Sequence, residues 1–185
     1  MTGTQEMKGI VRFALWGAVG FGVGGAIGGA VSPSLDVPYI GFPILGFFGG
    51  ASLGFALRDW KRAGLLALGS AIGFGVGFIV GFFILFSIFE PPYVKGLFLG
   101  AVMGGLGGAC IGLVLKGRVR VVLLALAGVI GFGLIMQFVS PWRQSFYVLS
   151  TLGWWPKFII WGIVGGTFLG AALGYLEIRK ADRAG

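Results

Sequence analysis

The chain has 185 residues, of which 57% are hydrophobic, 11% are charged and 38 are glycine, and its mean hydropathy is +0.97. This composition excludes a soluble domain, because too few polar residues remain to cover its surface. The net charge of +8 would suit nucleic acid in a soluble protein, but here the basic residues lie in short loops between apolar stretches. We therefore expect membrane lipids as partners and no nucleic acid.

Six apolar stretches reach or approach the length of about 20 residues that a helix needs to cross the hydrocarbon core of a membrane. In chain order they are Gly9–Val31, Tyr39–Leu57, Ala63–Phe89, Gly96–Leu115, Val121–Val139 and Phe158–Tyr175. The first is too long for a signal-peptide core and is taken as a helix. Strands of a β-barrel would alternate polar and apolar residues, which these stretches do not. The sequence predicts an all-α membrane protein with six transmembrane helices in one polytopic domain, residues 1–185.

Basic residues predict the orientation. Eleven of the fourteen lie on one side of the membrane, in the N-terminal segment, the second and fourth loops and the C-terminal tail. The other side holds Lys95, Arg143 and Lys157. Because short basic loops stay in the cytoplasm, we expect both termini there, with the protein in the inner membrane of a prokaryote.

Two glycine patterns recur along the chain. Gly-x-x-Gly-Gly-x-x-Leu/Ile-Gly begins at Gly46, Gly104 and Gly162, so each copy follows the last by 58 residues. Gly-Phe-Gly occurs at residues 20–22, 73–75 and 131–133. Each unit then has one helix with the short pattern and one with the long pattern. We predict three tandem parallel helical hairpins, at approximately residues 8–62, 63–120 and 121–180, in a pseudo-threefold arrangement.

Glycines spaced by four residues form narrow stripes on most of the predicted helices. Such a stripe lets two backbones approach closely, which increases van der Waals contact in lipid. We therefore predict glycine-zipper packing, either between helices of one chain or against another subunit. The predicted packing positions are Gly20, Gly24, Gly28, Gly46, Gly50, Gly54, Gly73, Gly77, Gly81, Gly104, Gly108, Gly112, Gly162, Gly166 and Gly170.

Two parts of the chain depart from the repeat. The fifth stretch has Ala127, Ile135 and Val139 where the third has glycine. We expect this bulkier face to meet lipid, with a partner protein as the alternative. Residues 140–156 contain tryptophan and tyrosine of the kind found at membrane interfaces, and are predicted to lie as an amphipathic segment on the outer surface. A lid over a binding cavity is the alternative.

Polar residues are scarce within the spans. Ser52, Cys110 and Thr167 fall at equivalent or neighbouring repeat positions, and would line a small cavity or pore if the second helices of the hairpins surround an axis. Alternatively, the hydroxyl groups bond the preceding turn of their own helices. Gln137, the fourth candidate for the cavity, is costly to leave facing lipid and is expected to meet a partner or the interface.

The chain has few residues of the kinds that carry out catalysis, relay protons or bind metals. All six acidic residues lie at helix ends or outside the spans, histidine is absent and Cys110 is single. A carboxylate that relays protons or couples a cation is therefore missing from the spans, and a Ser/His or Cys/His pair cannot be assembled. A phosphate-binding glycine motif is not present either. We expect no enzymatic activity, no metal and no cofactor.

The sequence thus predicts a non-catalytic integral membrane protein that serves as a packing or interaction subunit of a larger membrane assembly. Its expected protein partners are other membrane subunits or further copies of itself. The alternative is a small transporter, a substrate-binding transport component or a channel for a neutral or weakly polar solute. An enzyme acting on lipid is the third and least favoured hypothesis.

Overall fold

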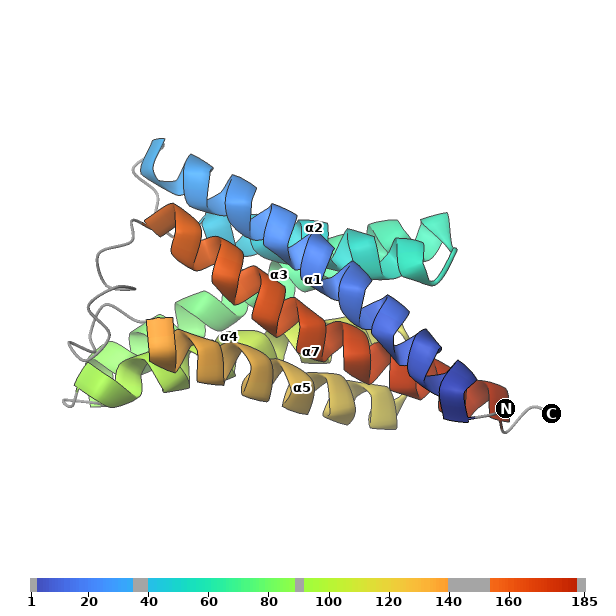
Figure 1. The fold of residues 1–185 in the computed structure, drawn as a ribbon. Coiled ribbons are helices and arrows are strands. Elements are labelled where there is room, and N and C mark those ends of the chain that lie inside the picture. The colour runs from blue at the N-terminus through green and yellow to red at the C-terminus, as the bar shows by residue number, and fades with distance from the viewer. Residues whose placement is uncertain (1–2, 35–39, 89–91, 140–153, 183–185) are drawn as a thin grey trace.

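The computed structural model describes residues 3–34, 40–88, 92–139 and 154–182, and this part of the chain is helical apart from short turns. The helices are α1 (Gly3–Ser34), α2 (Gly41–Ala56), α3 (Trp60–Ile88), α4 (Pro92–Val114), α5 (Arg118–Val139) and α7 (Trp154–Asp182) (Figure 1). The prediction of an all-helical chain is confirmed. Of the predicted interfacial segment, residues 140–153 lie outside the described residues.

Five of these helices, all except α2, are long and apolar enough to cross a membrane. The architecture is that of a membrane protein, and the prediction of six long spans is confirmed for five. Helix α2 has 16 residues, or about 24 Å at 1.5 Å per residue, and is shorter than the predicted stretch Tyr39–Leu57. It begins at Gly41 and ends at Ala56, one residue before the end of the predicted stretch. Arg58, which adopts a left-handed conformation with φ of 58°, prevents the helix from continuing further.

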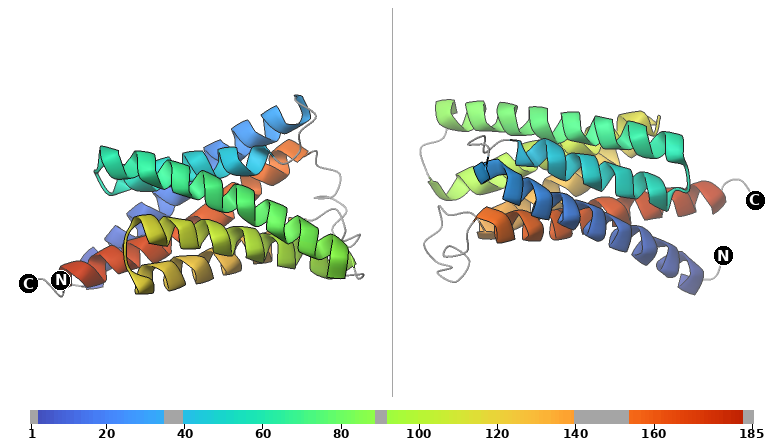
Figure 2. Two further views of the ribbon diagram at one scale, coloured as in Figure 1. Left: turned by 180° about the vertical axis from the view of Figure 1, so that it is seen from behind. Right: turned by 90° about the horizontal axis from the view of Figure 1, so that it is seen from above.

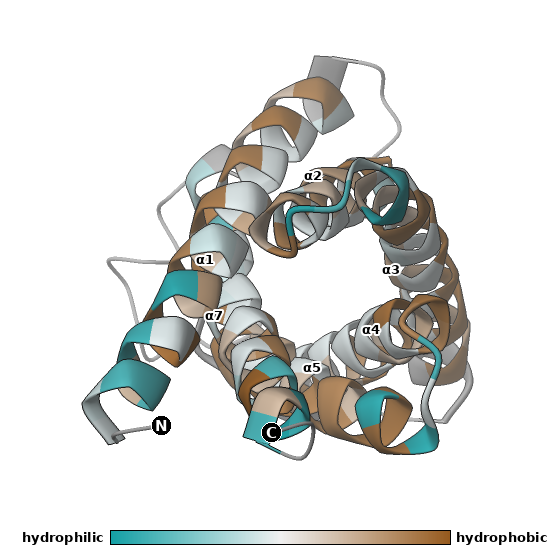
Figure 3. Ribbon diagram, turned by 90° about the vertical axis from the view of Figure 1, so that its right-hand side faces the viewer, coloured by the Kyte–Doolittle hydropathy of each residue, from teal (hydrophilic) through white to brown (hydrophobic). Residues whose placement is uncertain are grey.

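The helices stand side by side in a closed ring. Each packs against the next one along the chain, and α7 returns to pack against α1. Figure 3 shows this ring from the end of the bundle that holds both termini. The two further views in Figure 2 show that α1 and α7 run alongside each other. Ring closure therefore joins the first helix to the last.

The turn from α2 to α3 and the turn from α4 to α5 are built alike. Arg58 and Lys116, 58 residues apart, have φ of 58° and 54°. Their backbone N–H groups donate to Phe55 O at 2.9 Å and to Leu113 O at 3.0 Å. A left-handed residue directly after the last helical turn satisfies end carbonyls and reverses the chain within a few residues.

Many large apolar side chains of the helices are exposed. On α5, exposed side chains follow each other at four-residue intervals, at Val122, Leu126, Ile130 and Leu134. Ala127 and Ile135, which were expected to face lipid, instead lie half-buried against the core. The difference arises because one side of α5 carries the exposed stripe, and these two residues fall on the side that faces the bundle.

Candidate functional site

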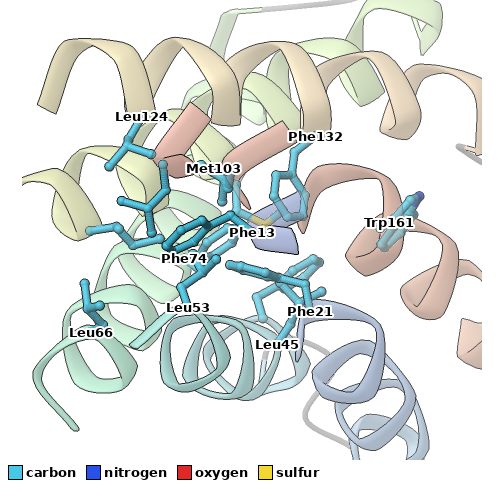
Figure 4. Close-up of a cluster of buried hydrophobic side chains, with 14 of the residues drawn as sticks. Phe13, Phe21, Leu45, Leu53, Leu66, Phe74, Met103, Leu124, Phe132 and Trp161 are labelled. Atoms are coloured by element: carbon cyan, nitrogen blue, oxygen red, sulfur yellow. The ribbon is translucent and has the colours of Figure 1, made fainter. Parts of the chain in front are cut away.

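Three phenylalanine rings meet at the centre of the ring of helices (Figure 4). Phe21 of α1, Phe74 of α3 and Phe132 of α5 are fully buried, and each is the middle residue of a Gly-Phe-Gly pattern. Their ring centroids lie 5.5 Å apart for Phe21 and Phe74, 5.9 Å for Phe21 and Phe132, and 4.9 Å for Phe74 and Phe132. The tilted and edge-to-face orientations are those that aromatic pairs favour. We call these residues the phenylalanine triad.

Each ring of the triad packs on a glycine of α2, α4 or α7. A Cβ atom added to the glycine would collide with the ring, at distances below those that real Cβ atoms show. These glycines are Gly49 under Phe21, Gly107 under Phe74 and Gly165 under Phe132. Each is the first residue of the double glycine in the long repeat. The sequence prediction did not include them, although their regular spacing of 58 residues was a signal that could have found them.

Apolar layers flank the phenylalanine triad on both sides. One helical turn before the glycines under the rings come Leu45, Met103 and Trp161, and one turn after them come Leu53, Ile111 and Leu169. Each layer takes one residue from α2, one from α4 and one from α7, and all six side chains are buried. Within the described residues, the centre of the ring is therefore filled by aromatic and aliphatic side chains.

The glycines predicted on α2, α4 and α7 lie against the next helix around the ring. Those of α2 face α3, those of α4 face α5 and those of α7 face α1. At Gly46, for example, an added Cβ would stand 2.6 Å from the carbonyl oxygen of Ser70. Real Cβ atoms do not approach backbone atoms this closely, so only glycine fits. The members of this set are Gly46, Gly50, Gly54, Gly104, Gly108, Gly112, Gly162, Gly166 and Gly170.

The glycines predicted on α1 and α3 face the following helix of the chain. An added Cβ at Gly24 of α1 would stand 2.8 Å from Leu45 O of α2, and one at Gly77 of α3 would stand 2.7 Å from Met103 Cα of α4. The members of this set are Gly20, Gly24, Gly28, Gly73, Gly77 and Gly81. Every predicted glycine thus touches a neighbouring helix of the same chain, which is the close backbone approach that a small residue permits.

The candidate cavity residues contact adjacent helices. Ser52 Oγ of α2 donates a hydrogen bond to Trp16 O of α1 at 2.6 Å. Cys110 of α4 lies beside Gly73 of α3, where an added Cβ would meet Cys110 Cβ at 2.9 Å. Ser52 and Cys110 are therefore placed at helix–helix contacts, beside the apolar layers that fill the centre.

Two further candidates use their polar groups within the bundle. Thr167 Oγ1 donates to Ile163 O, one turn earlier in α7, at 2.7 Å. Gln137 Oε1 of α5 accepts from the backbone N–H of Leu97 in α4 at 3.1 Å. Gln137 therefore joins two helices, as expected for an amide that would be costly to leave in lipid.

An ion pair joins α5 to α7 at the end of the bundle that holds the termini. Arg120 Nη2 lies 2.9 Å from Glu177 Oε1, and both side chains are largely buried. Arg120 Nη1 also donates to Leu115 O at 2.6 Å. The guanidinium group thus bonds both to the turn before α5 and to α7.

Among the described residues, no three side chains of histidine, cysteine, aspartate or glutamate come close enough to hold a metal ion. Comparison with known protein families, curated proteins and solved structures finds no match to this chain.

Proposed function

We propose that the chain is a non-catalytic membrane protein made of three parallel helical hairpins, α1–α2, α3–α4 and α5–α7, around a pseudo-threefold axis. The support is that one set of contacts occurs three times. Each hairpin gives one phenylalanine to the triad, one glycine beneath a ring and one glycine stripe that packs on the following hairpin. Repeats that cannot bury their faces alone gain stability by packing against one another.

Within this arrangement the protein acts as a packing or interaction subunit of a larger membrane assembly. The observation that carries the proposal is the phenylalanine triad, because three mutually contacting rings occupy the axis where a solute path would run. The apolar layers on both sides of the triad support the same reading. Passage of a solute through the centre of the ring is therefore disfavoured. Partner proteins bind instead to the outer faces and ends of the ring.

The partners are other membrane subunits or further copies of this chain, in contact through the exposed apolar faces. The apolar outer surface supports such contacts, since the exposed stripe on α5 and similar stripes on α1 and α3 can pack against lipid or another helix. The termini and the turns at Arg58 and Lys116 lie at one end of the bundle, which we place in the cytoplasm because it carries most of the basic residues.

Size measurement in mild detergent tests this proposal. The protein is extracted from its native membrane at low detergent concentration, and the protein mass of the particle is measured by light scattering. We expect a mass well above the 19.3 kDa of one chain. Co-expression of two differently tagged copies then separates self-association from a distinct companion. A particle with the mass of one chain, both in detergent and in lipid nanodiscs, contradicts the proposal.

A further inference from the structure

The helices α5 and α7 pack against each other less extensively than any other neighbouring pair of the ring, within the described part of the chain. In Figure 1 they lie close together toward the end of the bundle that holds the termini, and they diverge toward the end where α5 stops and α7 begins. At that diverging end each helix is bound to its other neighbour. Gln137 of α5 accepts a hydrogen bond from the backbone N–H of Leu97 in α4 at 3.1 Å, and Gly25 of α1 lies against the backbone of Phe158 in α7. We call the contact between α5 and α7 the α5–α7 seam.

Glycine is scarce along this seam. On α1 and α3, the first glycine of the series that faces the following helix is succeeded by two more at intervals of four residues. On α5 the corresponding first residue is Gly131, where an added Cβ would stand 2.9 Å from Phe168 Cβ and 3.2 Å from Gly165 Cα. The two positions that follow are Ile135 and Val139. The glycine contacts across the seam therefore lie at the level of the phenylalanine triad, and the positions of α5 nearer to the diverging end lack the glycines of the series.

The side chain of Ile135 sets the two helices apart. At the corresponding glycines of the other hairpins, an added Cβ would stand 2.8 Å from Leu45 O at Gly24 and 2.7 Å from Met103 Cα at Gly77. A branched side chain cannot be accommodated at that helix separation, because even its β-carbon would stand closer than real Cβ atoms approach. Ile135 is half-buried and packs against the core, so it fills space that the other hairpins close. The replacement of glycine by isoleucine gives the divergence of α5 and α7 a physical cause.

A buried donor lacks an acceptor on the same stretch of α7. Trp161 is 4% exposed and corresponds in the repeat to Leu45 and Met103, whose backbones face the preceding helix. Its Nε1 has no hydrogen-bond partner in the part of the chain that the structure describes, and in Figure 4 it points away from the labelled phenylalanines. A buried N–H group without an acceptor destabilises the arrangement that buries it. Separation of α5 from α7 would let the indole reach an acceptor from water or a lipid carbonyl group, which lowers the cost of that separation.

At the opposite end of the seam an ion pair joins the helices. Arg120 Nη2 of α5 lies 2.9 Å from Glu177 Oε1 of α7. The other ion pair among the described residues, between Asp59 and Arg62, joins residues three apart in the chain. The side chains of Arg120 and Glu177 are 17% and 23% exposed, so water screens their attraction less than that of a fully exposed pair. The two helices are therefore tethered at the end that holds the termini and packed less closely at the other.

We propose that the ring opens between α5 and α7 by a hinge motion about the end held by Arg120 and Glu177. In the open state α5 stays with α4 and α7 stays with α1, because glycines bring both of those pairs into close backbone contact. The ring of Phe132 then leaves Gly165, and the phenylalanine triad is uncovered from the side that faces the membrane. Hinge motions of this kind shift packed elements between two discrete arrangements. The opening adds a conformational change to the proposed function and does not depend on the identity of a partner.

Pulsed electron paramagnetic resonance in lipid nanodiscs tests the opening, with spin labels on cysteines in a Cys110→Ser background. One label pair, at Leu134→Cys and Ile163→Cys, spans the α5–α7 seam. The control pair, at Val23→Cys and Phe47→Cys, occupies the corresponding positions of α1 and α2, and all four side chains are exposed to a similar extent. For the first pair we expect a second population at longer distance and a distance distribution about twice as broad as that of the control, because two states are populated.

Substitutions then separate opening from a fixed gap. Ile135→Gly and Trp161→Met give the hairpin α5–α7 residues found at the corresponding positions of α3–α4, and each should reduce the longer population about twofold or more. Ile130→Gly, on the exposed face of α5, is the matched control and should not reduce it. Glu177→Gln should increase it. A single distribution as narrow as that of the control pair, at any mean distance, overturns the proposal. A longer population that persists unchanged in those of the two seam variants that fold also overturns it, and one that Glu177→Gln does not increase overturns the tether.

Discussion

Gly108→Ala tests whether the backbones of α4 and α5 are as close as the glycine contacts require. A Cβ at Gly108 would collide with Leu124 O and would stand 2.6 Å from Leu124 C, whereas ordinary contacts begin at 3.4 Å. Relief of the contact with Leu124 C alone requires the two backbones to separate by about 0.8 Å, and relief of the collision with Leu124 O requires a larger separation. Overpacking of this kind costs about 1–3 kcal/mol. Alanine also favours the helix over glycine by about 1 kcal/mol, which offsets part of the loss.

Gly64→Ala is the matched control, because an added Cβ at Gly64 of α3 meets nothing within 4 Å. It should raise the free energy of unfolding by up to about 1 kcal/mol through helix propensity alone. The difference in the free energy of unfolding between the two variants gives the cost of the contact between α4 and α5. We expect Gly108→Ala to be about 1–3 kcal/mol less stable than Gly64→Ala. The assay is reversible unfolding from mild detergent into sodium dodecyl sulfate, followed by far-ultraviolet circular dichroism. Equal stability of the two variants would refute the close approach of α4 and α5.

The same assay checks three more predictions. Phe74→Ala should lower the free energy of unfolding by about 3–5 kcal/mol, since it leaves a cavity within the phenylalanine triad, and a loss below about 1 kcal/mol would argue against a packed centre. Arg58→Gly should raise stability by about 1 kcal/mol, because glycine adopts the left-handed conformation without a penalty, while Lys61→Gly within α3 should lower it by a similar amount. Glu177→Gln should lower stability by about 1 kcal/mol through loss of the ion pair with Arg120, an effect that shrinks in 1 M salt if charge is its source.

Apolar length predicted the helices well and their ends poorly. Helix α1 runs from Gly3 to Ser34 although its apolar stretch is Gly9–Val31, because polar residues can continue a helix beyond the hydrocarbon core. Helix α2 runs from Gly41 to Ala56, within the predicted stretch Tyr39–Leu57, and the chain reverses at Arg58, two residues after its end. The length of an apolar stretch indicates which part of a helix crosses the hydrocarbon core of the membrane. The residue at which the helix ends depends on the local backbone conformation.

The composition of the centre was not predictable from hydropathy. Phe21, Phe74 and Phe132 lie in apolar stretches where a lipid-facing phenylalanine has the same hydropathy as a buried one. Their role becomes visible only when Gly49, Gly107 and Gly165, from other helices, are placed beneath them. The pattern repeated every 58 residues contained this information, but its meaning depends on contacts between distant segments.

The contacts and burial of the charged residues were not predictable from the sequence either. Lys157 was counted among the basic residues outside the spans, yet its side chain is buried at the start of α7. The pairing of Arg120 with Glu177 requires α7 to lie beside α5, which depends on closure of the ring. Sequence spacing cannot show such contacts, because they join residues that are far apart along the chain.

Closure of the ring within one chain is the central claim, and disulfide formation between Gly22→Cys and Ile163→Cys in a Cys110→Ser background tests it most directly. An added Cβ at Gly22 of α1 would stand 2.9 Å from Ile163 Cγ1 of α7, so two cysteines there fall within reach of a disulfide. We predict an intramolecular disulfide after mild oxidation in native membranes, and none when Gly64→Cys replaces Gly22→Cys. A failure to form the link, or disulfide-linked dimers in its place, would contradict the account.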